Sequence, residues 1–252
     1  RYIGDEVAAV AAIDEDTAQE ALDLIEVEYE ELPAVFDPEE AMRPGAPQLH
    51  DHTERNICGK TLLNHGDVEK GFRESDYIRE DRFKIMVVAH CQMEPHTVVA
   101  SFDTSGKLTV WPTCMGIYTR RGILSKVLNM PESMIRVINP YVGGAFGGKI
   151  ALLSLDICAA ILSKKTGRPV RIAYTREEQF FSAHTDHYMV AELKTGVKKD
   201  GSLLAHEFKA IAHEGAYCAI GPIFIYLAAL WLVGTYRMSN VRYEGYIVYT
   251  NT

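Results

Sequence analysis

The spacing of apolar and polar positions changes along the chain and predicts a mixture of strands and helices. Residues 25–30 alternate apolar and acidic side chains, which is typical of a strand with one face in water, and residues 6–13 alternate more weakly. Between these segments, residues 17–24 contain good helix formers preceded by an acidic N-cap. We therefore expect the order strand, helix, strand at this end of the chain.

A stretch rich in proline and glycine follows. Four prolines and one glycine lie between positions 33 and 47, and no periodic pattern is visible until about His65. A long irregular stretch of this kind is typical of a linker between domains. We therefore place one domain at residues 1–50, a linker at residues 51–66 and a second domain at residues 67–252.

The second region contains both helical and strand periodicities. We expect helices at residues 67–73, 117–128 and 151–164, and strands at residues 77–88, 97–102, 107–111, 135–138, 170–173, 189–197, 203–212 and 241–250. The strands on either side of the turn at residues 103–106 should form a β-hairpin. Because strands and helices follow each other without a regular βαβ rhythm, the predicted fold class is α+β.

Composition and charge exclude several classes of protein. An apolar content of 47% supports a buried core and excludes a disordered chain. Fourteen acidic residues face one basic residue within residues 1–40, and the remainder has only a small basic excess, so no nucleic-acid partner is expected. The apolar run at residues 220–233 is too short for a membrane span and is interrupted by Pro222. Five cysteines without a Cys-x-x-Cys pair fit reduced thiols in the cytoplasm.

The segment from Gly143 to Lys149 is the most informative part of the chain. Four glycines within six positions let backbone N–H groups approach a ligand, and a helix N-terminus just behind the loop would favour an anion. The segment also fits the start of a nucleotide-binding P-loop, but Ile150 replaces the hydroxyl residue that would hold magnesium. We expect a phosphate or an oxo group as the ligand, with a P-loop-like phosphate site or a purely structural turn as alternatives.

The same loop resembles the Gly-Gly-Gly-Phe-Gly-Gly-Lys segment in the molybdenum-binding large subunits of the xanthine dehydrogenase and aldehyde oxidase family. Residues 1–10 and 27–33 are similar to the end of the family's α/β hammerhead domain. Further segments that follow the family order are Met93-Glu-Pro-His96, Gly167-Arg-Pro-Val-Arg171, Thr175-Arg-Glu-Glu178, Gly215-Ala-Tyr217 and Val248-Tyr-Thr-Asn251. The resemblance implies the end of a hammerhead domain followed by the first part of a molybdenum-cofactor domain, with a mixed sheet and flanking helices.

The resemblance also implies an activity and its cofactors. In this family, molybdenum on molybdopterin, in a dinucleotide form, hydroxylates a small aldehyde or N-heterocycle, and electrons leave through iron–sulfur clusters toward FAD. Those clusters and the flavin are expected on partner subunits or domains. The positions that match the cofactor-binding loop are Gly143, Gly144, Ala145, Phe146 and Gly147. Residues 94–96 are expected to support this loop from beneath.

Two positions depart from the family pattern and concern the substrate. Many members carry a glutamine six residues before the Glu of the Glu-Pro-His motif, whereas this chain has Val88 there and Gln92 at a different spacing. Members that act on purines tend to carry a glutamate directly after the loop lysine, where this chain has Ile150. We therefore predict a substrate pocket lined by Val88 and Ile150 that differs from a purine pocket.

No catalytic residue and no metal ligand is predicted on the chain itself. The general-base glutamate of the family is expected beyond Thr252, and Arg1 is expected to lie inside the hammerhead domain. The chain is therefore interpreted as part of a molybdenum hydroxylase subunit, inactive alone, whose partners include the remainder of that subunit. The alternative from another class is a non-catalytic module that assembles iron–sulfur and flavin subunits.

Overall fold

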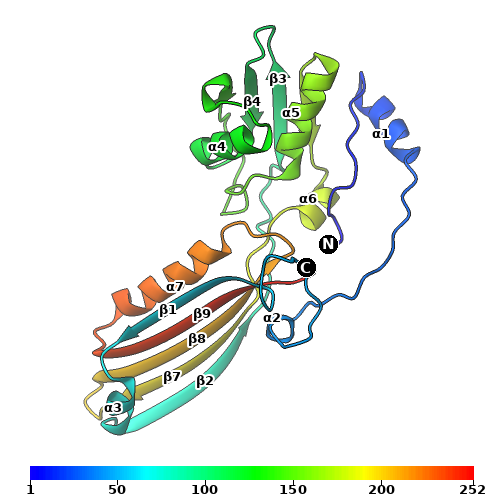
Figure 1. Cartoon of the computed structure of the whole chain (residues 1–252). Coiled ribbons are helices and arrows are strands. Elements are labelled where there is room, and N and C mark those ends of the chain that lie inside the picture. The colour runs from blue at the N-terminus through cyan, green and yellow to red at the C-terminus, as the bar shows by residue number, and fades with distance from the viewer. The chain divides into compact units, whose positions relative to one another are not determined.

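The computed structural model describes residues 1–252, which form two compact units (Figure 1). The first unit contains residues 1–2, 32–88 and 186–252, and the second contains residues 3–31 and 89–185. Each unit is built on its own β-sheet. Both units therefore combine segments that are distant in the sequence, and the assignment of residues 1–50 to a hammerhead domain stays a prediction.

The first unit contains a five-stranded sheet with one parallel pair. Its strands are, in order across the sheet, β1 (Ile57–His65), β9 (Asn240–Tyr249), β8 (Leu203–Gly215), β7 (Met189–Val197) and β2 (Tyr77–Ile85). Its helices are α2 (Pro38–Ala41), α3 (Val68–Arg73) and α7 (Gly221–Thr235). Only β8 and β9 run parallel, and the other neighbours are antiparallel.

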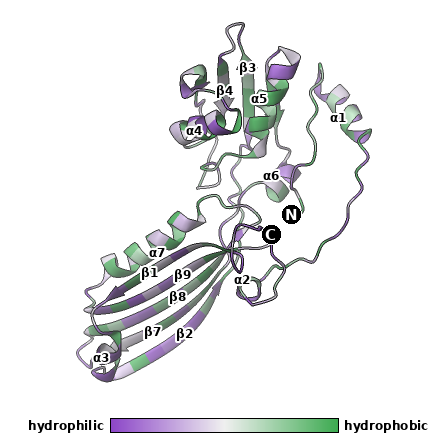
Figure 2. Ribbon diagram, in the orientation of Figure 1, coloured by the Kyte–Doolittle hydropathy of each residue, from purple (hydrophilic) through white to green (hydrophobic).

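The two faces of this sheet differ in polarity. Helix α7 has no charged side chain and packs on β1, β8 and β9 through Ile225 and Ala229, and it is mostly hydrophobic in Figure 2. The Tyr243 hydroxyl donates to the carbonyl of Ile225 at 2.9 Å. The opposite face carries ion pairs between strands, such as Lys194 with Glu80 at 2.8 Å. This second face is polar only in part, because Ile211 and Val248 are buried on it against α2, and Ala205 is buried on it against α3.

The second unit contains a four-stranded sheet covered by helices. Its strands are, in order, β5 (Ile135–Val137), β4 (Leu108–Pro112), β3 (Thr97–Phe102) and β6 (Val170–Ala173). Its helices are α1 (Glu15–Asp23), α4 (Ile117–Val127), α5 (Ser154–Thr166) and α6 (Arg176–Ser182), with a 3₁₀ turn at Glu132–Met134. Alternate residues of the hairpin, Val98 with Ala100 and Leu108 with Val110, are fully buried against Leu124 and other residues of this core.

The predicted α+β class is confirmed, and the expected elements from residue 67 onward are present within a few residues of their predicted ends. Two helices in this region, α6 and α7, are not among the predicted elements. Helix α6 begins with a capping box in which Thr175 and Glu178 exchange hydrogen bonds, and this is a readable sequence signal. Pro222 does not interrupt the apolar run at residues 220–233, because it lies in the first turn of α7, where proline is favoured. No helix combines the length and apolar character that crossing a membrane requires.

Three expectations before residue 67 are wrong. Helix α1 forms behind the Asp14 cap, but residues 6–13 and 25–30 form no strands. A strand needs a neighbour to complete its backbone hydrogen bonds, and none lies beside residues 25–30, where Tyr29 is 75% exposed. The stretch expected to be irregular contains α2 and all of β1 (Ile57–His65), which is an edge strand of the first sheet.

Candidate functional site

The predicted cofactor loop consists of two overlapping turns between β5 and α5. Gly148 N donates to the carbonyl of Ala145 at 2.9 Å, and Ile150 N donates to that of Gly147 at 3.2 Å. Gly144 and Gly147 have φ angles of 98° and 97°, which favour glycine, and Phe146 also has a positive φ of 50°. The structure therefore brings Gly143, Gly144, Ala145, Phe146 and Gly147 together in one loop whose shape depends on its glycines.

The carboxylate of Glu94 joins the two ends of this loop. Its Oε2 accepts a hydrogen bond from Gly143 N and another from Lys149 Nζ, each at 2.8 Å. The side chain of Lys149 is completely buried. Burial alone would raise the pKa of Glu94, but the hydrogen bonds from Lys149 and Gly143 hold it below its usual value. Glu94 is therefore a charged clamp that fixes the start and the end of the loop.

The imidazole of His96 supports the loop from beneath. Its Nε2 lies 3.1 Å from the carbonyl oxygen of Gly148, and its Nδ1 lies 2.9 Å from Oε1 of Gln179 on α6. Burial lowers the pKa of His96 to about 4, and the nearby Lys149 ammonium acts in the same direction. The expected support by residues 94–96 is therefore confirmed, with Glu94 contacting both ends of the loop and His96 contacting its end at Gly148.

We expect His96 to make the protein less stable in acid. Because its folded pKa of about 4 lies below the usual 6.5, the unfolded chain binds a proton that the folded protein does not. Its stabilising contribution is present above about pH 6.5 and is lost as the pH falls to 4, up to roughly 3 kcal/mol. Urea unfolding across this range should show a smaller loss for His96→Gln than for the wild type. Equal losses in the two proteins would contradict this role of His96.

Close packing explains why two of the loop positions are glycine. A Cβ on Gly143 would lie 2.7 Å from Cβ of Glu94, and one on Gly148 would lie 2.9 Å from Nδ1 of His90. Both distances are shorter than real Cβ contacts. A Cβ on Gly147 would come no closer than 3.5 Å to its nearest neighbour, His90. Gly143 is therefore required for close packing on Glu94 and Gly148 for close packing on His90, whereas Gly147 is required for its positive φ.

The nitrogen of a buried side-chain amide on a residue beside the loop has no hydrogen-bond partner. Gln92 is only 2% exposed, its Nε2 is unpaired, and its Cβ would lie 3.4 Å from a Cβ on Gly144. Arg176 fixes the backbone here by donating to the carbonyls of Gln92 and Met93 at 2.8 and 2.6 Å. An unpaired buried amide costs about 1–3 kcal/mol. Sequence spacing gave no reason to select Gln92, and burial without a partner is the signal that identifies it.

The contacts of Lys149 and of helix α5 argue against a P-loop. The Lys149 ammonium is buried on Glu94, so it does not face a ligand, as the lysine of a P-loop must. The first turn of α5 has its own anion, because Asp156 accepts the Leu153 N–H at 3.3 Å and pairs with buried Arg120. Burial raises the pKa of Asp156 to about 6 although Arg120 opposes this shift. The first turn of α5 therefore already contains an acidic side chain, and the binding of an anion at this helix N-terminus stays a prediction.

The two residues predicted to line the substrate pocket lie in different units. Ile150 directly follows the loop and is 38% exposed. Val88 is the last residue of the first unit's middle segment, and its carbonyl accepts a hydrogen bond from Asp186 N at 3.0 Å. Of the two predicted substrate-pocket residues, only Ile150 belongs to the unit that carries the loop.

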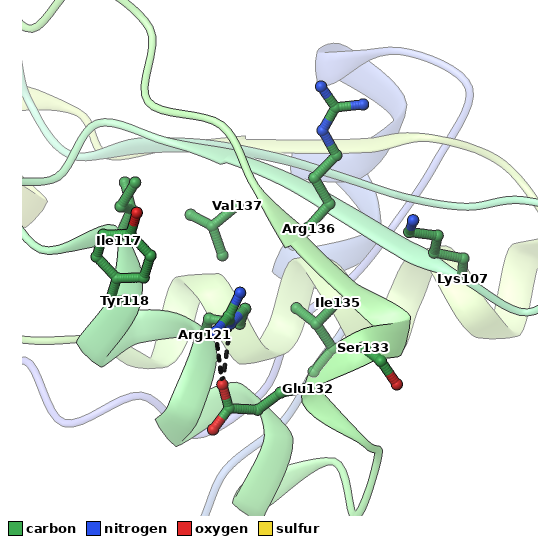
Figure 3. A pocket seen from close by; sticks show the side chains of 9 residues that line it. All are labelled: Lys107, Ile117, Tyr118, Arg121, Glu132, Ser133, Ile135, Arg136 and Val137. Carbon is green, nitrogen blue, oxygen red and sulfur yellow. Dashed lines mark hydrogen bonds and ion pairs between the residues drawn. The ribbon is translucent and has the colours of Figure 1, made fainter.

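A separate cavity of about 280 Å³ lies against α4 and β5 (Figure 3). Its lining includes Lys107, Arg121 and Arg136, but Arg121 already pairs with Glu132 at 2.9 Å. None of its lining residues belongs to the loop. Nowhere in residues 1–252 do three or more His, Cys, Asp or Glu side chains converge where they could hold a metal ion. The glycine loop with its support is therefore the strongest candidate site.

Known proteins are similar in sequence to this protein over its whole length. Residues 49–252 match the family described as the molybdopterin cofactor-binding domain. The chain is 40% identical over 251 residues to a probable xanthine dehydrogenase subunit of Bacillus subtilis (strain 168), covering 100% of this chain and 33% of that protein. It is 37% identical to the nicotinate dehydrogenase large molybdopterin subunit of Eubacterium barkeri, covering 100% of this chain and 58% of that protein.

A solved structure agrees with these matches. The fold resembles the crystal structure of quinoline 2-oxidoreductase from Pseudomonas putida 86, with a TM-score of 0.89 and 30% identity, over 96% of this chain and 31% of that chain. The chain thus spans between about a third and three fifths of the length of these relatives. It belongs to the molybdopterin cofactor-binding domain of the xanthine dehydrogenase and aldehyde oxidase family, as its motifs had indicated.

Proposed function

We propose that residues 143–147 hold the molybdenum–molybdopterin cofactor of a hydroxylase. The observation that carries this proposal is the buried, unpaired amide of Gln92 beside Gly144. The N–H groups of Phe146 and Gly147 also donate to no other group of the chain. Two unpaired N–H groups in the loop and an unpaired amide nitrogen on Gln92, whose Cβ packs beside Gly144, fit an oxygen-rich ligand such as this cofactor.

The cofactor, when bound, supplies the two-electron oxidation that hydroxylates a substrate carbon with oxygen from water. The residues of this chain supply binding and orientation. Gln92 and the loop N–H groups bind the cofactor, while Glu94, Lys149 and His96 fix the loop so that its donors need not reorganise. The aromatic ring of Phe146, which is 75% exposed, forms a wall of the site.

We further propose a small N-heterocycle or aldehyde as the substrate. The nicotinate dehydrogenase and quinoline 2-oxidoreductase relatives support the N-heterocycle class by their names. The apolar side chain of Ile150 cannot hydrogen bond to a purine nitrogen, and we assign it to the substrate pocket. A dinucleotide form of the cofactor completes this proposal.

The remaining parts of the proposal concern the assembly. We propose a cytoplasmic complex in which iron–sulfur and FAD subunits or domains accept the electrons. Residues 1–50 are assigned to the end of a hammerhead domain and residues 67–252 to the first part of the cofactor domain. The general-base glutamate is assigned to a part of the subunit outside residues 1–252.

The variant Gln92→Met tests the proposed site. In the full-length subunit, this change should lower the molybdenum and pterin content several-fold, because it removes a donor to the cofactor. The cofactor-free variant should nevertheless be more stable by about 1–2 kcal/mol, since an unpaired buried amide is replaced by an apolar side chain. Metal analysis, pterin fluorescence and urea unfolding measure these effects.

The variant Gln19→Met is the matched control, because Gln19 lies exposed on α1 and pairs with Asp23. It should leave cofactor content and stability unchanged. Normal molybdenum content in Gln92→Met would refute the proposed role of this amide. Complete absence of molybdenum and pterin from the wild-type subunit would favour the non-catalytic assembly module.

A further inference from the structure

The segment that follows the glycine loop has no regular secondary structure of its own. Residues 149–153 lie between the loop and the start of α5, and no helix or strand includes them. Two backbone contacts hold the start of this segment, because Ile150 N donates to the carbonyl of Gly147 at 3.2 Å and Met115 N donates to that of Lys149 at 3.0 Å. The position of Ile150, which we assign to the substrate pocket, therefore depends on contacts with residues outside the segment.

A buried guanidinium holds the far end of this segment. Arg120 on α4 is only 2% exposed, and its Nη2 donates to the carbonyl of Ala151 at 2.8 Å. Its Nη1 donates to Oδ2 of Asp156 in the first turn of α5. The same carboxylate oxygen accepts the N–H of Leu153 at 3.3 Å. Arg120 and Asp156 together therefore fix residues 151 and 153, directly behind Ile150.

The loop and the segment behind it have separate supports. Glu94 and His96 hold the loop itself, within residues 143–149. The guanidinium of Arg120 acts instead on the backbone behind the loop. Its planar fork donates to two acceptors at once, whereas a lysine ammonium is a compact charge on a flexible stem and does not reproduce this geometry. A change at Arg120 should therefore displace Ile150 while the loop keeps its own support.

We propose that Arg120 is a positioning residue that places the Ile150 side chain for contact with the substrate. The inference rests on the proposed function, because it takes Ile150 as part of the substrate pocket. Arg120 is buried, so it acts through the Ala151 carbonyl. A displaced Ile150 side chain weakens the apolar contact with a small N-heterocycle or aldehyde and leaves the cofactor in place. Arg120 therefore contributes to substrate affinity and substrate choice rather than to cofactor binding.

Steady-state kinetics of the full-length enzyme loaded with molybdenum test this proposal, with nicotinate, quinoline and benzaldehyde as probes. The variant Arg120→Lys keeps a positive charge beside Asp156 but loses the fork. We expect KM to rise roughly 3- to 10-fold, the size of one weakened apolar contact, with kcat and molybdenum content within about two-fold of the wild type. The matched control is Arg121→Lys, at the next position but in an exposed pair with Glu132, and it should leave KM unchanged.

Two further measurements show whether Arg120 acts through Ile150. Ile150→Ala should itself raise KM, and adding Arg120→Lys should then change KM by less than about two-fold, because residues that act as one unit are not additive. Hydrogen exchange at residues 149–153 of the cofactor-free protein should be about ten-fold faster in Arg120→Lys and unchanged in Arg121→Lys. Where Arg120→Lys folds poorly, Arg120→Met combined with Asp156→Leu removes the pair without leaving a buried charge and should raise KM in the same way.

The outcomes separate this inference from the proposed function. An unchanged KM in loaded Arg120→Lys, or two KM effects that multiply fully in the combined variant with Ile150→Ala, would overturn the inference alone. Equal hydrogen exchange at residues 149–153 in the wild type and Arg120→Lys would do the same. A loaded wild type that hydroxylates none of the three probes would overturn the proposed function together with the inference.

Discussion

Replacing Gly147 by valine in the full-length subunit is expected to abolish binding of the molybdenum cofactor. Gly147 has a φ of 97°, and a β-branched residue is strained there by on the order of 1–3 kcal/mol. The valine methyl groups would also crowd the backbone N–H groups that we assign to the cofactor. The ratio of molybdenum to protein should fall from near one to near zero, as measured by metal analysis of the purified protein.

The variant Gly106→Val separates backbone strain from loss of the site. Gly106 has a φ of 82° in the hairpin turn between β3 and β4, and a Cβ there would meet no atom within 4 Å. The backbone strain is therefore similar, but the loop is untouched. Gly106→Val should keep its molybdenum. Equal molybdenum contents in the two variants would contradict the role assigned to Gly147.

Replacing Glu94 by alanine is expected to lower the free energy of unfolding by about 3 kcal/mol and to release the cofactor. The change leaves the ammonium of Lys149 fully buried without a countercharge, and breaking a buried ion pair in this way costs roughly 3–5 kcal/mol. We expect the lower end of this range because the Glu94 side chain is 32% exposed and water can partly replace it. Urea unfolding of the cofactor-free protein measures the stability directly.

Two further variants control for this effect. Glu80→Ala removes a comparable contact, since Glu80 pairs with Lys194 at the same 2.8 Å, but both side chains are exposed. It should cost only a small fraction of what Glu94→Ala costs, because water screens an exposed ion pair. The double variant Glu94→Ala with Lys149→Met should regain much of the lost stability, because no unpaired charge stays buried. A double variant less stable than Glu94→Ala would contradict the buried ion pair as the cause.

Local sequence patterns predicted those parts of the fold that depend on near neighbours. The hairpin of β3 and β4 followed from alternation at Val98, Ala100, Leu108 and Val110, which point into the core as expected. The acidic alternation at residues 25–30 has the same form but no strand beside it. A periodic pattern therefore describes which faces a strand would have, and only the tertiary structure decides whether a partner strand is present.

The candidate site, too, is predictable only in those parts that have a local sequence signal. The density of glycines made the loop visible, because positive φ angles at Gly144 and Gly147 are properties of the residues themselves. Lys149 was open to interpretation as a P-loop lysine, since its partner Glu94 lies 55 residues away. The candidate role of Gln92 is equally non-local, because it depends on the burial of this side chain beside Gly144 in the folded protein. Distant contacts of this kind have no local sequence signal.

Anomalous X-ray diffraction at the molybdenum absorption edge, from crystals of the full-length subunit, tests the central claim most directly. We expect one strong anomalous peak per subunit beside the backbone of residues 143–147 and the amide of Gln92. A molybdenum peak remote from this loop, or fully loaded crystals in which Gln92 stays unpaired, would contradict the assignment of the cofactor to this site.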